Sequence, residues 1–418
     1  MTAAVASRDT DMIVTGIGVV APTGTSLEDH WQAVLAGKSA IGRITRFDPS
    51  GYPVTFAGEV AGFEAKGRVP GRLIPQTDRW THMALVAAEA ALEDAGADPA
   101  ALPEYEMAVV TSSSSGGTEF GQHEMERLYQ QGPSWVGAYQ SIAWFYAATT
   151  GQLSIRHGMR GPCGVVCAEQ AGGLDAIAQS RRLLRTGSRL VLTGGTDSAL
   201  CPYGLVAQMT SGLLSTSDDP GSAYLPFDAE ARGHVPGEGG AILVTERADA
   251  ARDRGHTGGY GVVRGHAAGF DLPRDPGTQR GRDRPPVLAA VIRRALADAA
   301  LAPADIDVVF ADAAGSPELD LAEARAIGDV FGPRRVPVTA PKTLTGRLYG
   351  GGAPLDVATA LLSIRDGLIP HTVGTTGPAP AYGIDLVLDR PRETAVRHAL
   401  VLARGHGGFN AALVLGAR

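Results

Sequence analysis

Short apolar runs of strand length recur along the chain, and they constrain its fold more than any other feature. They begin at Met107, Leu190, Ala241, Val308, Leu386, Ala399 and Ala411. The runs are continuous rather than alternating in polarity, which is typical of strands buried on both faces. Helical patterns lie between several of them, at residues 81–95, 174–185, 287–300 and 355–366. Alternating strands and helices predict a layered α/β architecture.

The chain has enough apolar side chains for a large core, because 44% of its 418 residues are hydrophobic and only 19% are charged. The stretch 256–286 is rich in Gly, Arg, Asp and Pro. We interpret it as a surface excursion at the seam between two halves, residues 1–255 and 256–418. The arginines within it, Arg280, Arg282 and Arg284, alternate with acidic residues, as in a solvated loop.

Charge and cysteine content exclude several classes of protein. The net charge of -7 argues against nucleic-acid binding, which needs a clustered basic face. The first residues have no apolar stretch typical of an export signal, and no run is long enough for a membrane span. Cys163 and Cys167 have no second Cys or His pair to complete a metal site. We expect a cytoplasmic protein with free, mostly buried thiols and no metal or cofactor.

Two patterns occur near the start of the chain. Gly16-x-Gly18-x-x-Ala21 is similar to a dinucleotide fingerprint placed after a short strand. We disfavour that interpretation because Pro22 delays the following helix and no acidic residue follows a second strand about 20 residues later. Ser26 and Asp29 have the spacing of a capping box and predict a helix that ends before Gly37.

The segment 161–176 passes from an apolar strand through a tight turn into a helix and places Gln170 at the first helical turn. It resembles the nucleophile elbow of the β-ketoacyl synthases, in which a cysteine stands at this position. The resemblance extends over nearly the whole chain. It includes the motifs Val14-Thr-Gly-Ile-Gly, Pro226-Phe-Asp, Gly237-Glu-Gly-Gly and Gly405-His-Gly-Gly-Phe-Asn. It implies a thiolase-like fold with two similar halves in α/β/α/β/α layers.

The catalytic positions that this resemblance implies are degenerate. Ala314 and Arg347 stand where the family has two histidines, whereas Lys342 of the second histidine motif is retained. A carboxamide forms no thioester, alanine donates no hydrogen bond from its side chain, and arginine does not exchange protons as imidazole does. We therefore expect no catalytic residue and no useful condensation.

Further motifs resemble the chain length factors, the ketosynthase β subunits of bacterial type II polyketide synthases. They are Ala168-Glu-Gln-Ala-Gly-Gly, Val309-Phe-Ala-Asp, Pro317-Glu-Leu-Asp, Pro341-Lys-Thr and Gly346-Arg-Leu-Tyr. The resemblance implies a silent subunit that pairs with a ketosynthase α subunit, receives chains from an acyl carrier protein and shapes the tunnel that sets polyketide length. It implies neither a nucleic-acid nor a membrane partner.

Alternatives remain for the degenerate residues. Gln170 either hydrogen-bonds to backbone amides at the helix start or acts in a malonyl-carrier-protein decarboxylase that supplies the primer. A self-sufficient condensing homodimer is disfavoured, because neither Cys163 nor Cys167 stands at the elbow. We expect Lys342 to be a relic of the active site or a member of a structural ion pair, and Arg347 to pair with a carboxylate or cap a loop.

The same resemblance places the tunnel-closing positions on two segments. They correspond to Thr118, Gly121, Met125, Gly204 and Leu205. The spacing of the first three places them on one helical face, although an ordinary interface helix would show the same spacing. Some relatives carry aromatic rings at the places of Thr118, Met125 and Leu205. The smaller side chains here predict a longer product, a decaketide or beyond.

Overall fold

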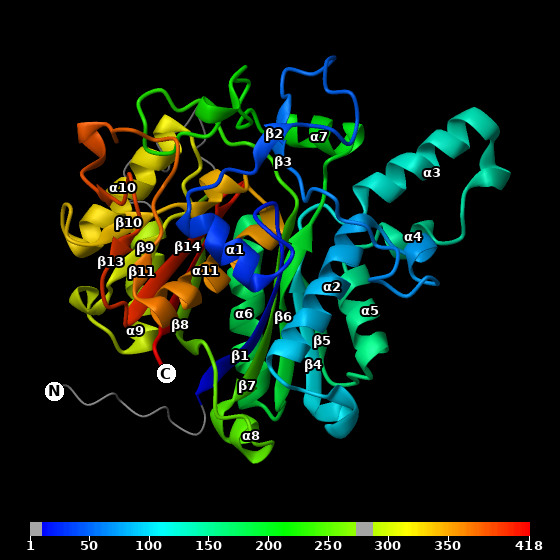
Figure 1. Ribbon diagram of the computed structural model, residues 1–418, viewed down its shortest axis with the longest axis horizontal. Coiled ribbons are helices and arrows are strands. Elements are labelled where there is room, and N and C mark those ends of the chain that lie inside the picture. Colours follow the sequence, from blue (N-terminus) through cyan, green and yellow to red (C-terminus); the bar gives the residue numbers. More distant parts are fainter. Residues whose placement is uncertain (1–10, 273–286) are drawn as a thin grey trace.

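The computed structural model describes residues 11–272 and 287–418, and its centre is a mixed sheet of eleven strands (Figure 1). The first residues, considered above for an export signal, and the arginines between 280 and 284 lie outside the described residues. In the described part of the chain, every helix is too short or too polar to cross a bilayer.

Two halves of the sheet repeat one topology. The first half has the order β5-β4-β6-β7-β1 and contains β1 (Met12–Val20), β4 (Met107–Ser112), β5 (Cys163–Val166), β6 (Leu190–Asp197) and β7 (Gly239–Arg247). The second has the order β10-β9-β14-β15-β8 and contains β8 (Gly261–Phe270), β9 (Val308–Phe310), β10 (Pro337–Thr339), β14 (His398–Gly405) and β15 (Phe409–Gly416). Each pair of neighbouring strands in the first half has the same orientation, parallel or antiparallel, as the corresponding pair in the second half. The two halves are connected by the antiparallel pair β1 and β8. The predicted pair of similar halves is confirmed, while a boundary at residue 255 stays a prediction.

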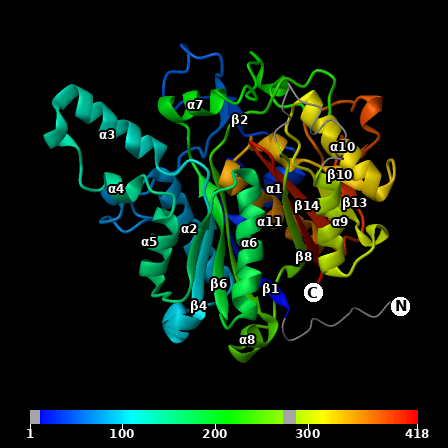
Figure 2. The same cartoon turned by 180° about the vertical axis from the view of Figure 1, so that it is seen from behind.

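Helices lie outside and between these halves (Figures 1 and 2). Helix α2 (Arg79–Asp94) covers β1 and β7, and α9 (Val287–Ala299) covers β8 and β15. Helices α6 (Gln170–Arg185) and α11 (Gly352–Asp366) contact each other and strands of both halves. These contacts confirm the predicted α/β/α/β/α layers. The central strands β4 and β6 are buried along their whole length, as their continuous apolar runs predict.

The remaining elements are shorter or peripheral. The helices are α1 (Leu27–Leu35), α3 (Thr118–Gln131), α4 (Gln140–Ala143), α5 (Ala148–His157), α7 (Pro202–Met209), α8 (Ala248–Asp253) and α10 (Pro317–Phe331). The strands are β2 (Ile41–Arg43), β3 (Phe56–Gly58), β11 (Leu368–Ile369), β12 (Asp385–Leu386) and β13 (Arg392–Glu393). Single 3-10 turns are η1 (Ile74–Gln76), η2 (Pro99–Ala101), η3 (Glu104–Glu106), η4 (Pro133–Trp135), η5 (Pro220–Ser222), η6 (Pro303–Asp305), η7 (Pro341–Leu344), η8 (Tyr349–Gly351) and η9 (Pro380–Tyr382).

The glycines near the start of the chain lie inside a strand, not in a ligand-binding loop. A Cβ on Gly16 would lie 2.1 Å from the carbonyl oxygen of Ala91, and one on Gly18 would lie 1.8 Å from that of Ala87. Both positions therefore need glycine because α2 packs directly on β1. The glycine pattern was expected to follow a short strand, and this is wrong, because β1 continues through both glycines to Val20.

The predicted N-cap of the first helix is confirmed, although the Asp29 carboxylate accepts from the Ser26 hydroxyl at 2.7 Å rather than completing a capping box with the Ser26 backbone N–H. The Ser26 hydroxyl accepts a hydrogen bond from the backbone N–H of Asp29, and α1 ends at Leu35.

The segment 256–286 was predicted as an irregular surface stretch, and this prediction is wrong for residues 261–270. They form β8, which pairs with β15 along its length. Gly265 and Gly269 lie in this strand because α9 packs closely over them, and a Cβ on Gly265 would lie 2.3 Å from the carbonyl oxygen of Ala295. Glycines that look like loop formers here permit close packing of a helix on a strand.

Candidate functional site

The elbow has the strand–turn–helix geometry that the sequence predicts. Strand β5 ends at Val166, and α6 begins at Gln170. Between them Glu169 adopts φ 50° and ψ -133°, a conformation that is costly for a residue with a side chain. This sharp turn places residue 170 at the buried N-terminus of α6, where it has no exposed surface.

The Gln170 carboxamide is enclosed without hydrogen-bond partners. Neither its oxygen nor its nitrogen bonds to another group in the described part of the chain. A Cβ on Gly352, the first residue of α11, would lie 2.5 Å from Oε1, so the amide packs directly on that helix start. The prediction that Gln170 bonds to backbone amides of the helix is therefore wrong.

A cavity beside Gln170 has room for about one water molecule. About 10 Å³ is open to the centre of a water there, close to the minimum that one water needs. Its lining includes the polar side chains of Gln170, His30, Lys342, Thr345, Asp356 and Thr359 together with Pro341, Leu348 and Leu355.

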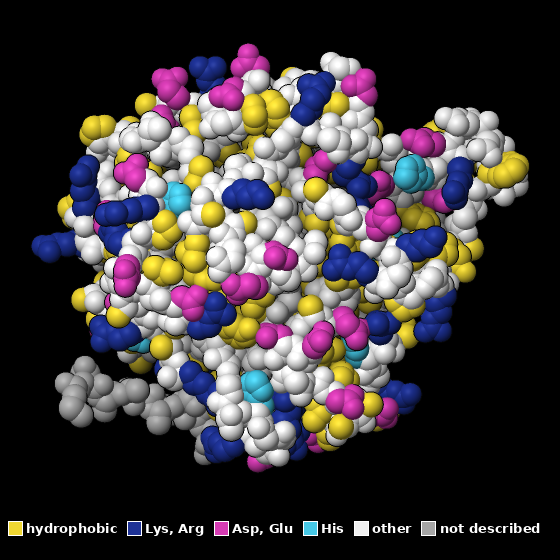
Figure 3. All heavy atoms as spheres, in the orientation of Figure 1, with side chains coloured by type: hydrophobic (Ala, Val, Ile, Leu, Met, Phe, Trp, Pro, Cys, Tyr) yellow, Lys and Arg dark blue, Asp and Glu magenta, His cyan; other side chains and the backbone are white. Residues whose placement is uncertain are grey.

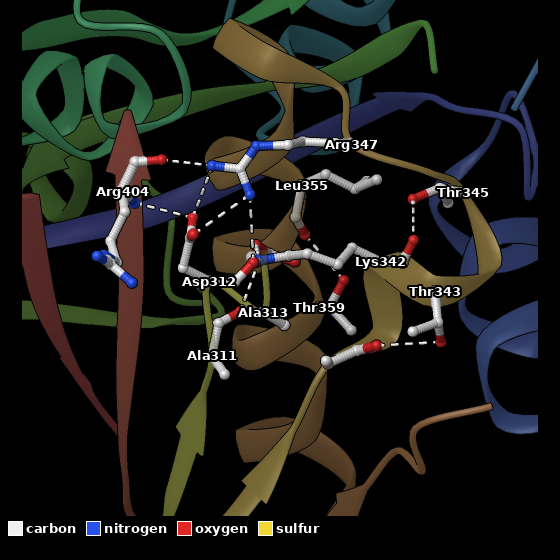
Figure 4. A network of polar contacts seen from close by, with 12 residues as sticks. Ala311, Asp312, Ala313, Lys342, Thr343, Thr345, Arg347, Leu355, Thr359 and Arg404 are labelled. Carbon is white, nitrogen blue, oxygen red and sulfur yellow. Dashed lines mark hydrogen bonds and ion pairs between the residues drawn. The ribbon is translucent and has the colours of Figure 1, made fainter. Parts of the chain in front are cut away.

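Lys342 is held in a buried ion pair, as predicted. Its Nζ lies 2.8 Å from Oδ2 of Asp356 on α11 and donates to the backbone oxygens of Ala311 and Asp312 (Figure 4). The lysine therefore ties the loop after β10 to the loop after β9.

Arg347 lies at the centre of a second network, and its predicted carboxylate pair is confirmed. Its Nη2 lies 3.0 Å from Oδ1 of Asp312, and its Nε lies 3.3 Å from Oε1 of Glu169. The guanidinium also donates to the backbone oxygen of Arg404 (Figure 4). One side chain thus connects the strained elbow residue to the ends of β9 and β14.

Opposing effects set the charge of Asp312. Burial by itself would raise the pKa of this carboxyl group, but Arg347 and Lys342 hold the pKa below its usual range. Asp312 is therefore ionised at neutral pH, and the network consists of matched charges.

Ala314 is buried in the loop after β9, and its methyl group takes the place where the family has a histidine. Two other histidines that sequence reasoning missed lie in this region. His234 is buried beside the ring of Tyr349, with 6.2 Å between ring centroids. Burial and the charge of Arg347 lower the pKa of His234 to about 3.

His30, from α1, is the second missed histidine. Its Nδ1 lies 2.6 Å from the Thr23 hydroxyl, and its Nε2 lies 3.0 Å from the Thr359 hydroxyl. Burial lowers the pKa of His30 to about 4. Both imidazoles are therefore neutral near pH 7. The sequence does not reveal this site, because a single histidine in an amphipathic helix gives no indication that it is buried between two threonine hydroxyls.

The thiols do not replace the missing nucleophile. All three cysteines are free, but Cys163 and Cys167 are exposed, so the expectation of mostly buried thiols is wrong for these two. Burial raises the pKa of the Cys167 thiol, and Cys201 has a pKa raised to about 11, also by burial. Neither group is activated as a thiolate.

The five predicted tunnel residues lie on α3 and α7, two helices in contact near their N-termini. Thr118 is buried at the start of α3, and Met125 is 38% exposed further along it. Between them, a Cβ on Gly121 would lie 2.9 Å from the indole of Trp144. On α7, Gly204 and Leu205 are buried, and Leu205 packs in a small core cluster with Leu200 and Leu214.

Residues 118–146 form an arm that projects from the body of the molecule (Figures 1 and 2). Apolar side chains on the arm are open to solvent, and some are visible in the space-filling view (Figure 3). They are Met125, Leu128, Tyr129, Trp135, Val136, Tyr139, Ile142, Trp144, Phe145 and Tyr146. Such a concentration of exposed apolar side chains is typical of a protein interface.

The edge of the sheet next to the arm is also uncovered. Strand β5 ends the strand order, and its residues are exposed or half-buried, whereas those of β4 beside it are buried. An unpaired strand edge offers backbone groups to a partner.

Comparison with known proteins agrees with this architecture. The family models for the beta-ketoacyl synthase N-terminal and C-terminal domains match residues 9–250 and 260–376. The tetracenomycin polyketide synthase ketoacyl synthase beta subunit of Streptomyces glaucescens is 60% identical over 98% of this chain and 99% of its own. The actinorhodin polyketide putative beta-ketoacyl synthase 2 of Streptomyces coelicolor is 56% identical over 97% and 98%.

A solved structure described as the ishigamide ketosynthase/chain length factor superposes with a TM-score of 0.86 at 27% identity, covering 98% of this chain and 99% of that one. The chain belongs to the beta-ketoacyl synthase family, among the ketosynthase beta subunits of type II polyketide synthases.

Proposed function

We propose that the chain is a chain length factor, a subunit without condensing activity that pairs with a ketosynthase α subunit and lines the tunnel in which a polyketide grows. The observation that carries the proposal is the elbow, where a fully buried carboxamide occupies the position of a thiol.

The chemistry of the site supports an inactive subunit. An amide nitrogen has a delocalised lone pair and cannot carry an acyl group as a thioester. Arg347 is committed to Asp312 and Glu169, and the alanine at 314 offers no side-chain donor. Because losing one transition-state donor costs about 10²- to 10³-fold in rate, the combined losses leave no useful condensation.

The arm and the β5 edge support a heterodimer. Together they offer a large apolar surface and an open strand to a partner, which is typical of obligate interfaces. The partner ketosynthase would supply the nucleophile, and an acyl carrier protein would deliver the malonyl units.

The test is co-expression with the ketosynthase encoded beside this chain, followed by co-purification and the mass of the product. We expect a one-to-one complex that makes one main polyketide, and no acylation of this chain when it is purified alone. Acylation and elongation by the isolated chain would overturn the proposal.

Decarboxylation by Gln170 is the alternative, and the space beside the carboxamide disfavours it. A cavity for one water has no room for a malonyl group. Since Gln170 has no hydrogen bond to another residue in the described part of the chain and Met has a similar volume, we expect Gln170→Met to retain carbon dioxide release within about threefold.

The measurement for this variant is carbon dioxide release from malonyl carrier protein by the complete pair, with the partner's nucleophile inactivated. A matched Gln179→Met variant, at a half-buried position of the same helix, controls for the substitution itself. A loss of tenfold or more at position 170 alone, about 1.4 kcal/mol, would favour the decarboxylase.

The interface makes a separate prediction. Trp135 and Phe145 are 61% and 55% exposed on the arm, so aspartate at both positions should leave the fold of this chain intact and disrupt pairing. Buried aromatic anchors often contribute about 2 kcal/mol each, which predicts at least about 100-fold weaker association. Analytical ultracentrifugation measures the effect, with Leu272→Asp in the other half as the control. Wild-type association of the double variant would exclude the arm as the interface.

A further inference from the structure

The arm helix α3 begins without a cap of its own. Its N-cap residue is Gly117, which has no side chain to accept hydrogen bonds from the first turn. The N–H of Phe120, in that turn, instead donates to Oδ2 of Asp78 at 2.7 Å. The start of α3 therefore depends on a residue from another part of the chain.

Asp78 belongs to the rigid body of the molecule. It is the N-cap of α2, and its Oδ1 accepts from the N–H of Trp80 at 3.3 Å. Helix α2 packs on β1 and β7, and Trp80 has no exposed surface. One carboxylate, itself 3% exposed, thus caps a core helix and the arm helix together.

Two more contacts hold the same helix start against α7. Arg46 lies 2.5 Å from Oε1 of Glu119 on α3, and its Nε donates to the backbone oxygen of Leu200 just before α7. Gln122 on α3 accepts from the backbone N–H of Tyr203 in the first turn of α7 at 2.9 Å.

We infer that Asp78, assisted by Arg46, is a positioning residue for product length, because it fixes the first turn of the helix that carries Thr118 and Gly121. This inference rests on the proposed function, in which those residues line the tunnel. Each ketide lengthens an extended chain by about 2.5 Å, so a shift of α3 by one to two ångströms changes which length fits.

Asp78→Asn separates positioning from folding. Burial raises the pKa of Asp78 to about 7, although the hydrogen bond from Phe120 lowers it, so the neutral amide imposes little burial penalty. Asparagine retains one acceptor oxygen for two N–H donors and therefore loses one of the two caps. We expect a heterodimer of near wild-type melting temperature.

The readout is the product distribution of the complete synthase. The free energy of one lost hydrogen bond corresponds to a factor of about five in a population ratio. We therefore expect products of other lengths to rise about fivefold relative to the main product. Glu119→Gln, which weakens the Arg46 contact, should shift the distribution in the same direction. The matched control is Asp98→Asn, because Asp98 caps the exposed turn η2 in the same way but stands beyond the C-terminal end of α2, whereas Asp78 stands at the N-terminal end.

Substitutions at Thr118 and Met125 are measured in the same assay. If these change product length while Asp78→Asn and Glu119→Gln leave the distribution as in wild type, the positioning inference is overturned and the proposed function stands. If no α3 substitution changes product length, the proposed tunnel is overturned as well. Should Asp78→Asn yield no complex, Glu119→Gln alone decides, with an unchanged distribution overturning the inference.

Discussion

Arg347→Met is expected to destabilise the folded chain by about 3–5 kcal/mol, the usual cost of leaving one partner of a buried ion pair uncompensated. The side chains of Arg347 and Asp312 are 5% and 1% exposed, so solvent cannot replace the lost partner. Glu169 at the strained elbow loses a charge partner in the same substitution. Urea denaturation of the purified complex measures the change.

The stability lost in Arg347→Met should increase with pH. In the wild type the pKa of Asp312 lies below its usual range, so its stabilising contribution is present above about pH 4 and is lost on acidification. Without Arg347, Lys342 and Arg404 still lower the pKa of Asp312, but burial is the largest effect on it. We therefore expect this pKa to rise above its usual range, so that the folded variant binds a proton that the unfolded chain releases. Its stability then falls as pH rises, and the deficit is larger at pH 8 than at pH 5.

Two controls accompany this variant. Arg156→Met removes an exposed pair with Glu89 and should cost less than about 1 kcal/mol. Adding Asp312→Asn to Arg347→Met should recover part of the loss, because the unpaired charge is removed. A deficit below 1 kcal/mol, constant with pH, would show that the network contributes little to folding.

The strands that could be predicted are those whose apolar runs are uninterrupted. The runs at Met107, Leu190 and Ala241 became β4, β6 and β7, because full burial on both faces requires apolar side chains throughout. Strand β8 was missed because Gly265 and Gly269 are needed where α9 packs against it, and glycines within a run resemble a loop. Although α9 is the next element along the chain, no pattern within residues 261–270 shows that it packs on these glycines.

The candidate site shows the same difference between features that follow from a local pattern and features that depend on packing with other elements. The place of Gln170 at a helix start follows from the local order of strand, turn and helix, and it was predicted. Its lack of hydrogen bonds depends on Gly352 and the packing of α11, which no local pattern contains. Likewise, Trp135 and Phe145 are of residue types that usually pack in a core, and only the structure shows that they are exposed on the arm.

Replacing both Thr118 and Met125 with phenylalanine is expected to shorten the polyketide by one to two ketide units. Both residues lie on α3, one buried at its start and one partly exposed, and in the proposed tunnel each added ring would take up depth. An extended chain gains about 2.5 Å per ketide, comparable with the depth that a ring fills. Product mass from the complete synthase measures the change.

Phenylalanine at the buried position 118 also risks overpacking, which typically costs about 1–3 kcal/mol. Met125→Phe alone avoids this cost, since Met125 is 38% exposed in the isolated chain, and it should still shorten the product. Gln130→Phe adds the same ring to an exposed position on another side of α3 and should leave the length unchanged. Gly121 is no substitute position, because a Cβ there would lie 2.9 Å from the Trp144 indole and would displace the arm as well as narrow the proposed tunnel. An unaltered product from both the double and the Met125 variants would refute the assignment of α3 as the length-setting wall.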